Sequence, residues 1–188
     1  MSKIDPNINY QQEDQKVFDK YCKKYKYYPL ILPARKDNQI IIAIGDIHGD
    51  YNLMIQCLRL AEVIDDNNNW IGGDTVIIQN GDILDNCRPL DKKCEEEIDD
   101  LSPYNGSIPE DIKILKFFTE LNEQANKVNG LIITLYGNHE LMNVMSNMNY
   151  VSYKDLRKFE DYKDPNNPNL TFSSGKEARK HAFKPGNE

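Results

Sequence analysis

The stretch that most constrains the fold is the apolar, isoleucine-rich run at residues 40–44, which ends abruptly in Gly45-Asp46-Ile47-His48-Gly49-Asp50. Such a run predicts a buried central strand, here residues 39–44. Open α/β sheets bind ligands beyond the carboxyl ends of their strands, which is where this polar tail falls. Asp46 and His48 stand one residue apart, and a carboxylate with an imidazole suits a divalent transition metal.

The same pattern recurs twice further along the chain. The apolar run at 75–79 precedes Asn80-Gly81-Asp82-Ile83-Leu84-Asp85, and the run at 131–135 precedes Tyr136-Gly137-Asn138-His139-Glu140. Apolar residues recur at helical spacing between these runs, at positions 53, 57, 58 and 61 and at positions 112, 115, 118, 121 and 125. Strand, helix and strand therefore alternate, which predicts βαβ units, a parallel sheet and an α/β fold.

The helix starts have their own signals. Asp50 or Asn52 can cap the helix after the first strand, and Ser107-Ile108-Pro109-Glu110 is typical of a capping box. Short helical segments are expected at 153–162 and 176–183, with a helix or loop at 141–150. Residues 1–38 are expected to form an N-terminal arm with a short helix, and residues 39–188 a single domain.

Composition and charge exclude some classes of protein. A chain of 188 residues with 39% hydrophobic and 28% charged residues suits one soluble globular domain. Its formal net charge of −7 argues against a nucleic-acid surface but not against a phosphoester held through metal ions. Because no signal peptide or membrane-spanning run is visible, we expect an intracellular, cytoplasmic protein that binds no membrane.

The four cysteines, Cys22, Cys57, Cys87 and Cys94, contain no closely spaced CxxC pair. In a chain of this length they predict free thiols of an intracellular protein rather than a disulfide framework.

Parallel strands in register bring their carboxyl ends to one edge of a sheet, so the three polar tails are predicted to meet there. Together they supply two carboxylates, an imidazole and an amide oxygen, which suit two divalent ions that share a bridging carboxylate. We assign Asp46 and His48 to the first ion, Asp82 to both as the bridge, and Asn138 to the second.

The remaining polar residues predict hydrolytic chemistry at phosphorus. A pair of ions activates a shared water, and the resulting hydroxide attacks phosphorus in line. His139, beside the ligand Asn138 but not itself a ligand, is the candidate general acid. Asp85 can accept a hydrogen bond from the other ring nitrogen of His139. Arg88 is the candidate phosphate-binding guanidinium, and a simple surface arginine is the alternative.

In combination the three tails resemble the GDxHG, GDxxD and GNHE motifs of the calcineurin-like metallophosphoesterases. Within that family, Gly137-Asn138-His139-Glu140-Leu141-Met142-Asn143 and the later Ala182-Phe183-Lys184-Pro185-Gly186 resemble the Shewanella-like protein phosphatase branch. Tyr136 favours this branch, because eukaryotic phosphoprotein phosphatases carry an arginine just before GNHE. The resemblance covers residues 39 to about 186, with a weakly matching stretch at 91–108.

The resemblance implies an α/β sandwich whose metal site lies at the carboxyl ends of the strands. It implies a Ser/Thr- or Tyr-directed phosphomonoesterase that uses two divalent ions, Mn, Fe or Zn, on a phosphoprotein or a small phosphoester. One alternative is a nucleotide or dinucleotide polyphosphate hydrolase of the same superfamily. Another is a truncated, non-catalytic remnant that binds metal.

Two departures from the family pattern bear on these alternatives. Family members follow the second motif with Asp-Arg-Gly, whereas this chain has Asp85-Asn86-Cys87-Arg88, so its arginine is displaced. The family also completes its metal sites with later histidines, whereas this chain has three histidines, of which His181 is expected on a basic surface helix. We therefore expect the N-terminal portion of such a domain, truncated at its C-terminus. Its uncovered sheet face predicts self-association.

Overall fold

The computed structural model describes residues 38–88, 94 and 107–185. The predicted N-terminal arm falls almost wholly outside these residues, and every described helix and strand belongs to the unit Gln39–Glu188. The elements follow in the order β1 (Ile41–Ile44), α2 (Tyr51–Leu60), β2 (Val76–Gln79), α3 (Glu110–Asn126), β3 (Leu131–Thr134), α4 (Asn138–Val144), α5 (Tyr153–Arg157) and α6 (Gly175–Ala182).

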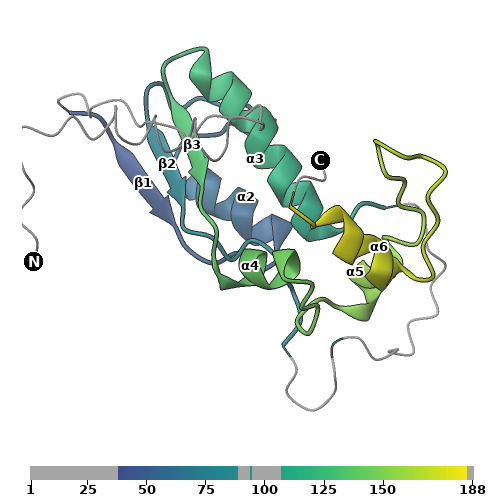
Figure 1. Ribbon diagram of the computed structural model, residues 1–188. Coiled ribbons are helices and arrows are strands. Elements are labelled where there is room, and N and C mark those ends of the chain that lie inside the picture. The colour runs from purple at the N-terminus through teal and green to yellow at the C-terminus, as the bar shows by residue number, and fades with distance from the viewer. Residues whose placement is uncertain (1–37, 89–93, 95–106, 186–188) are drawn as a thin grey trace, which may run out of the picture. The chain divides into compact units, whose positions relative to one another are not determined.

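The three strands form one parallel sheet in the order β1-β2-β3, which confirms the predicted alternation of strand and helix (Figure 1). The predicted central position of β1 is wrong, because β2 is central and β1 lies at an edge among the described residues. Ile40 and Ile41 are 60% and 46% exposed. An apolar run signals burial, but its composition does not reveal the order of strands in a sheet.

The two long helices lie on the same side of the sheet (Figure 1). Met54 and Leu58 of α2 and Phe118 of α3 pack in one core with Ile77 of β2. The predicted face of α2 is correct at Leu58 and wrong at Leu53, which is 41% exposed. Helical spacing leaves the rotation of a helix uncertain by one position, and here Met54 takes the inward place.

The opposite sheet face carries Ile41, Val76 and Leu131 in one row of paired residues and Ala43, Ile78 and Ile133 in the next. All six are at least partly exposed. The self-association expected from an uncovered sheet face stays a prediction.

The two long helices begin differently. Asp50 caps α2 as predicted, since its Oδ1 accepts the Leu53 N–H at 2.9 Å. The capping box predicted at 107–110 is wrong: Pro109 is the N-cap of α3 and offers no side-chain hydrogen bond. Glu110 and Asp111 instead place negative charge in the first turn of α3, where the helix dipole favours it.

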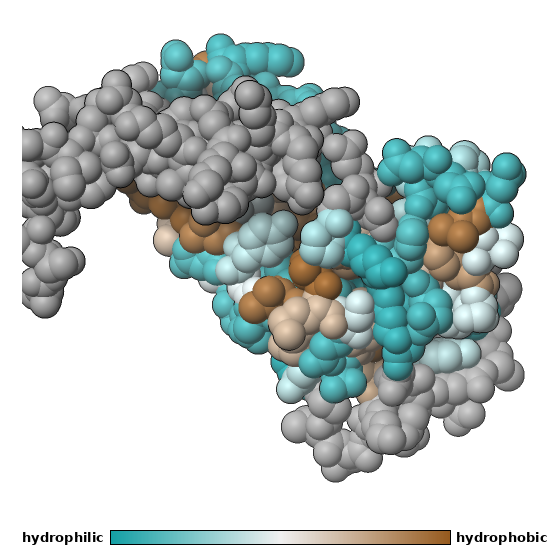
Figure 2. All heavy atoms as spheres, viewed as in Figure 1, coloured by the Kyte–Doolittle hydropathy of each residue, from teal (hydrophilic) through white to brown (hydrophobic). Residues whose placement is uncertain are grey.

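Past β3 the chain forms three short helices. The helix predicted at 153–162 is present as the shorter α5, and the helix predicted at 176–183 corresponds to α6. These two helices pack against each other. His181 on α6 is half-buried, with its Nε2 2.5 Å from Asp164 Oδ2. Figure 2 shows hydrophobic residues on the surface around α4, where Leu141 and Met145 are exposed.

A disulfide joins Cys87 and Cys94, so the prediction of free thiols is wrong for this pair. Both cysteines are held by one later segment: the Cys87 N–H donates to the Tyr150 carbonyl, and the Cys94 carbonyl accepts the Tyr153 N–H. Hydrogen bonds between residues so far apart in the sequence leave no local pattern from which this disulfide could have been predicted. Cys57 is free and half-buried.

Because disulfides are typical of oxidising compartments, the cytoplasmic location stays a prediction. No helix in the described ranges has the length and apolarity needed to cross a bilayer.

Candidate metal centre

The site lies at the carboxyl ends of β1 and β2, where the sequence predicted it. One potential ligand atom from each of Asp46, His48 and Asp82 falls within 4.8 Å of the others. The loops that carry them are joined by backbone hydrogen bonds, because the Ile47 and His48 N–H groups both donate to the Asp82 carbonyl at 3.0 Å. The parallel pairing of the two strands thus brings these side chains together.

The contacts of the His48 ring leave one of its nitrogens available to a cation. Its Nδ1 lies 3.1 Å from the Leu84 carbonyl oxygen, which can only accept, so Nδ1 carries the proton. Nε2 is then the nitrogen with a free lone pair, and it lies 3.5 Å from Asp46 Oδ2. Metal-binding histidines are commonly oriented by such a carbonyl on the far ring nitrogen.

Several site residues adopt a backbone conformation that is uncommon outside glycine. His48, Asp82 and Asp85 have φ angles of 47°, 55° and 66°. The surrounding hydrogen bonds hold them in this left-handed region, and strained residues of this kind cluster at functional sites.

The third strand tip approaches Asp82 through glycine. A Cβ at Gly137 would overlap Asp82 Oδ1, so this close approach requires a glycine. Asp82 Oδ1 also accepts the His139 N–H at 2.9 Å, which leaves Oδ2 for a cation. Asn138 lies between Gly137 and His139 in the sequence. It is the first residue of α4, and its side chain is exposed. Its role as a ligand stays a prediction.

The second functional group is a buried pair. His139 Nδ1 lies 3.0 Å from Asp85 Oδ2, the contact expected from the sequence. Burial raises the pKa of the Asp85 carboxyl, while hydrogen bonds from Asn143 and His139 and the charge of Arg179 oppose that rise. The His139 ring meets the His48 ring edge-on at 4.7 Å between centroids, so the pair adjoins the candidate metal ligands.

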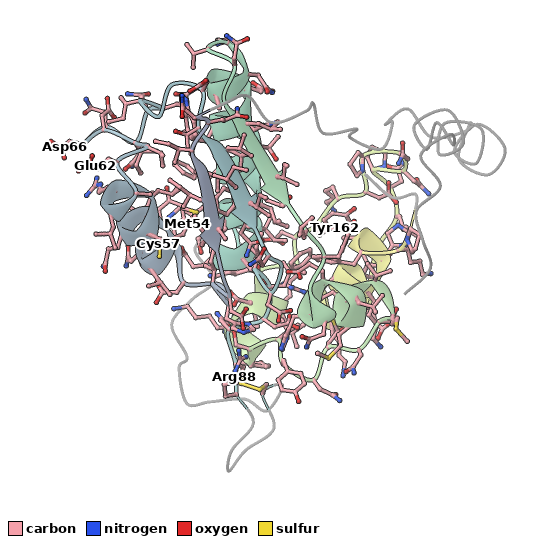
Figure 3. The ribbon with its side chains drawn as sticks, turned by 90° about the vertical axis from the view of Figure 1, so that its left-hand side faces the viewer. Met54, Cys57, Glu62, Asp66, Arg88 and Tyr162 are labelled. Carbon is pink, nitrogen blue, oxygen red and sulfur yellow. A yellow bond between two sulfur atoms is a disulfide. The ribbon has the colours of Figure 1, made fainter. Side chains whose placement is uncertain are left out.

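Arg88 is exposed, and its guanidinium donates to the carbonyls of Asp85 and Cys87 at 3.3 and 3.0 Å. In Figure 3 it lies at the end of the molecule that also carries the disulfide. The loop that carries Arg88 therefore occupies some of the hydrogen-bond donors of the guanidinium. The role of Arg88 in binding phosphate stays a prediction.

The sequence analysis assigned no role to Glu140, whose carboxylate ties the site loops together. It accepts four backbone N–H groups at 2.7–3.0 Å, from Asp82, Ile83, Leu84 and Gly137. Its position three residues after Gly137 is that of a capping-box glutamate, the one local signal that could have revealed it.

Comparison with known proteins identifies the architecture. Residues 40–182 match the model of the family described as calcineurin-like phosphoesterase. The chain belongs to the calcineurin-like phosphoesterase family. This confirms the resemblance inferred from the three motifs.

Two curated relatives of this calcineurin-like phosphoesterase are Shewanella-like protein phosphatases. Number 2 from Arabidopsis thaliana is 34% identical over 124 residues, which are 66% of this chain and 26% of the relative. Number 1 from Plasmodium berghei (strain Anka) is 36% identical over 124 residues, 66% of this chain and 28% of the relative. The chain thus spans about a quarter of these relatives' length. A solved cold-active protein-tyrosine phosphatase of a psychrophilic Shewanella species is 21% identical, with a TM-score of 0.48 over 85% of this chain and 44% of that one.

Replacing Glu140 by Ala in this calcineurin-like phosphoesterase should lower the free energy of unfolding by about 4 kcal/mol or more. The substitution leaves four backbone donors without their acceptor in a largely buried place, and each unsatisfied donor costs about 1–3 kcal/mol. Urea unfolding followed by circular dichroism measures the loss. The exposed Glu123→Ala on α3 is the matched control, and a Glu140→Ala loss equal to that of the control would contradict the assigned role.

Proposed function

We propose that this chain carries the metal-binding edge and the acid–base pair of a metal-dependent phosphomonoesterase of the Ser/Thr protein phosphatase type. The observation that carries the proposal is the meeting of the Asp46, His48 and Asp82 side chains beside the buried Asp85–His139 pair. The similarity to Shewanella-like protein phosphatases supports a phosphoprotein as substrate.

The donor set fits two divalent cations. The first would be held by Asp46 and by Nε2 of His48, the second by Asn138, and Asp82 would contact both. Mixed carboxylate, imidazole and amide ligands suit Mn, Fe or Zn, of which manganese is our first choice. Such ions, once bound, supply an activated water and neutralise phosphate charge.

His139 performs the proton transfer in this proposal. With Nδ1 turned to Asp85, Nε2 is the nitrogen that donates a proton to the leaving alkoxide oxygen. Asp85 fixes the ring tautomer, and Arg88 would bind phosphate oxygens by turning its guanidinium away from its own loop.

Metal dependence is directly testable by thermal unfolding. Adding MnCl₂ to chelator-treated protein should raise Tm, since a ligand present at about 100 times its Kd stabilises the folded state by about 2.7 kcal/mol. EDTA should reverse the shift. An unchanged Tm at millimolar MnCl₂, together with no metal retained after gel filtration, would contradict the proposal.

The activity assay compares phosphopeptides with dinucleotide polyphosphates in the presence of manganese. Faster turnover of phosphopeptides supports the protein phosphatase. Preference for the dinucleotides indicates the polyphosphate hydrolase, and metal binding without any turnover indicates a non-catalytic metal-binding protein.

A further inference from the structure

Arg179 of α6 is the largest fully buried side chain in the described part of the chain. Its guanidinium reaches three other segments. Nη2 lies 2.7 Å from Asp111 Oδ2 at the start of α3, Nε donates to Asn143 Oδ1 of α4 at 2.9 Å, and Nη2 is 3.6 Å from Asp85 Oδ1.

Aromatic rings hold the same guanidinium in place. The Phe159 and Phe183 ring centroids lie 5.3 and 4.9 Å from its central carbon, distances at which a cation is attracted to the ring faces. Arg179 is thus fixed by hydrogen bonds, two ion pairs and ring contacts, so its position has little freedom.

From Arg179 a continuous series of contacts leads to the acid–base pair. Asn143 receives the Arg179 Nε–H on its oxygen and donates from its nitrogen to Asp85 Oδ1 at 2.8 Å. Asp85 then presents its other oxygen, Oδ2, to His139. The contacts of Oδ1 therefore determine which way the Asp85 carboxylate is turned.

Stability alone is a weak explanation for this arrangement. Buried ion pairs often contribute no more than well-packed apolar side chains of the same volume, because desolvation offsets their attraction. Burial raises the pKa of Asp85, and the hydrogen bond from Asn143 and the charge of Arg179 partly offset that rise.

We propose that Arg179 is a positioning residue for His139, acting through Asn143 and the Asp85 carboxylate. The inference rests on the proposed role of His139 in proton transfer. The hydrogen bonds and ion pairs of Arg179 go to Asn143, Asp111 and Asp85 and not to the candidate ligands Asp46, His48 and Asp82, so its replacement should leave metal content unchanged.

The first test is independent of turnover. The protein is labelled with ¹⁵N-histidine, zinc is added, and the histidine ring signals are recorded by NMR. The signals of His139 are identified as those that disappear in the His139→Asn variant. Arg179→Met should shift the His139 Nδ1 signal and speed the exchange of its proton, whereas Lys180→Met on the same helix should leave both unchanged. Unaltered His139 signals in folded Arg179→Met would overturn the inference. If Arg179→Met does not fold, the same comparison in Arg179→Lys decides, because lysine keeps the charge but cannot reproduce the forked contacts.

The second test separates positioning from general destabilisation. Phenyl phosphate has a poor leaving group and needs the proton from His139 more than p-nitrophenyl phosphate does. Arg179→Lys should lower kcat about tenfold for phenyl phosphate and less than about twofold for p-nitrophenyl phosphate, with KM unchanged. In an Asp85→Asn background the same substitution should add little. Equal loss on both substrates would contradict positioning, whereas absence of turnover in every variant would count against the proposed function and leave the spectroscopic result standing.

Discussion

Replacing Asp82 by Asn should abolish metal binding at the strand ends and, with it, turnover. The amide oxygen of the new side chain can still accept the His139 N–H, so the local fold is kept. The amide nitrogen that takes the place of Oδ2 cannot bind a cation. Loss of an outer partner of a metal ligand already costs about 10–100-fold in affinity, so loss of the carboxylate proposed to bridge the two ions should cost more than about 100-fold.

Isothermal titration with MnCl₂ and elemental analysis after gel filtration measure this loss. Asp74→Asn is the matched control, because Asp74 is exposed and lies beyond the opposite end of the same strand β2. The control should bind metal as the wild type does. An Asp82→Asn variant that retains two ions would remove Asp82 from the metal centre.

The second large effect is expected at His139. His139→Asn should lower kcat by about 10²–10⁴-fold, the contribution typical of a general acid, while metal content stays at the wild-type level. The ring is buried and its Nδ1 contacts Asp85 rather than a candidate metal ligand, which is why its loss should spare the ions.

Steady-state kinetics on phosphopeptide and elemental analysis of the same sample separate the two roles. A His139→Asn variant that loses its metal would show that His139 is a ligand. Normal turnover would exclude it as the acid. His181→Asn is the control, since His181 of α6 pairs with Asp164 instead.

The strand tips could be predicted because each is a local signal, an apolar run followed by glycine and a polar residue. Parallel pairing then brings Asp46, His48 and Asp82 together without further information. The position of β1 in the sheet could not be predicted, because strand order depends on pairing between segments. For the same reason, burial of the isoleucines at one edge was overestimated.

The residues that hold the candidate site in place could not be predicted from sequence patterns. Arg179 lies in a lysine-rich helix that reads as solvated surface, and its partners Asp111 and Asn143 stand 68 and 36 residues away. A charged residue in a first helical turn, such as Asp111, is favoured there by the helix dipole alone, so its position does not indicate a buried partner. Buried polar networks are defined by tertiary contacts, so only coordinates reveal them.

The joining of α3, α4 and α6 by a single guanidinium has a consequence for synthesis of the protein. A nascent chain that stops before residue 179 contains Asp85 and Asp111 but lacks the cation that neutralises them in the core. Burying the Asp111 carboxylate without its cation is costly, and Asp85 keeps only its contacts with Asn143 and His139, so we expect α3 and α4 to reach their final packing around these carboxylates only after α6 has left the ribosome. The contacts around His139 are then complete only when nearly all of the described fold has been made.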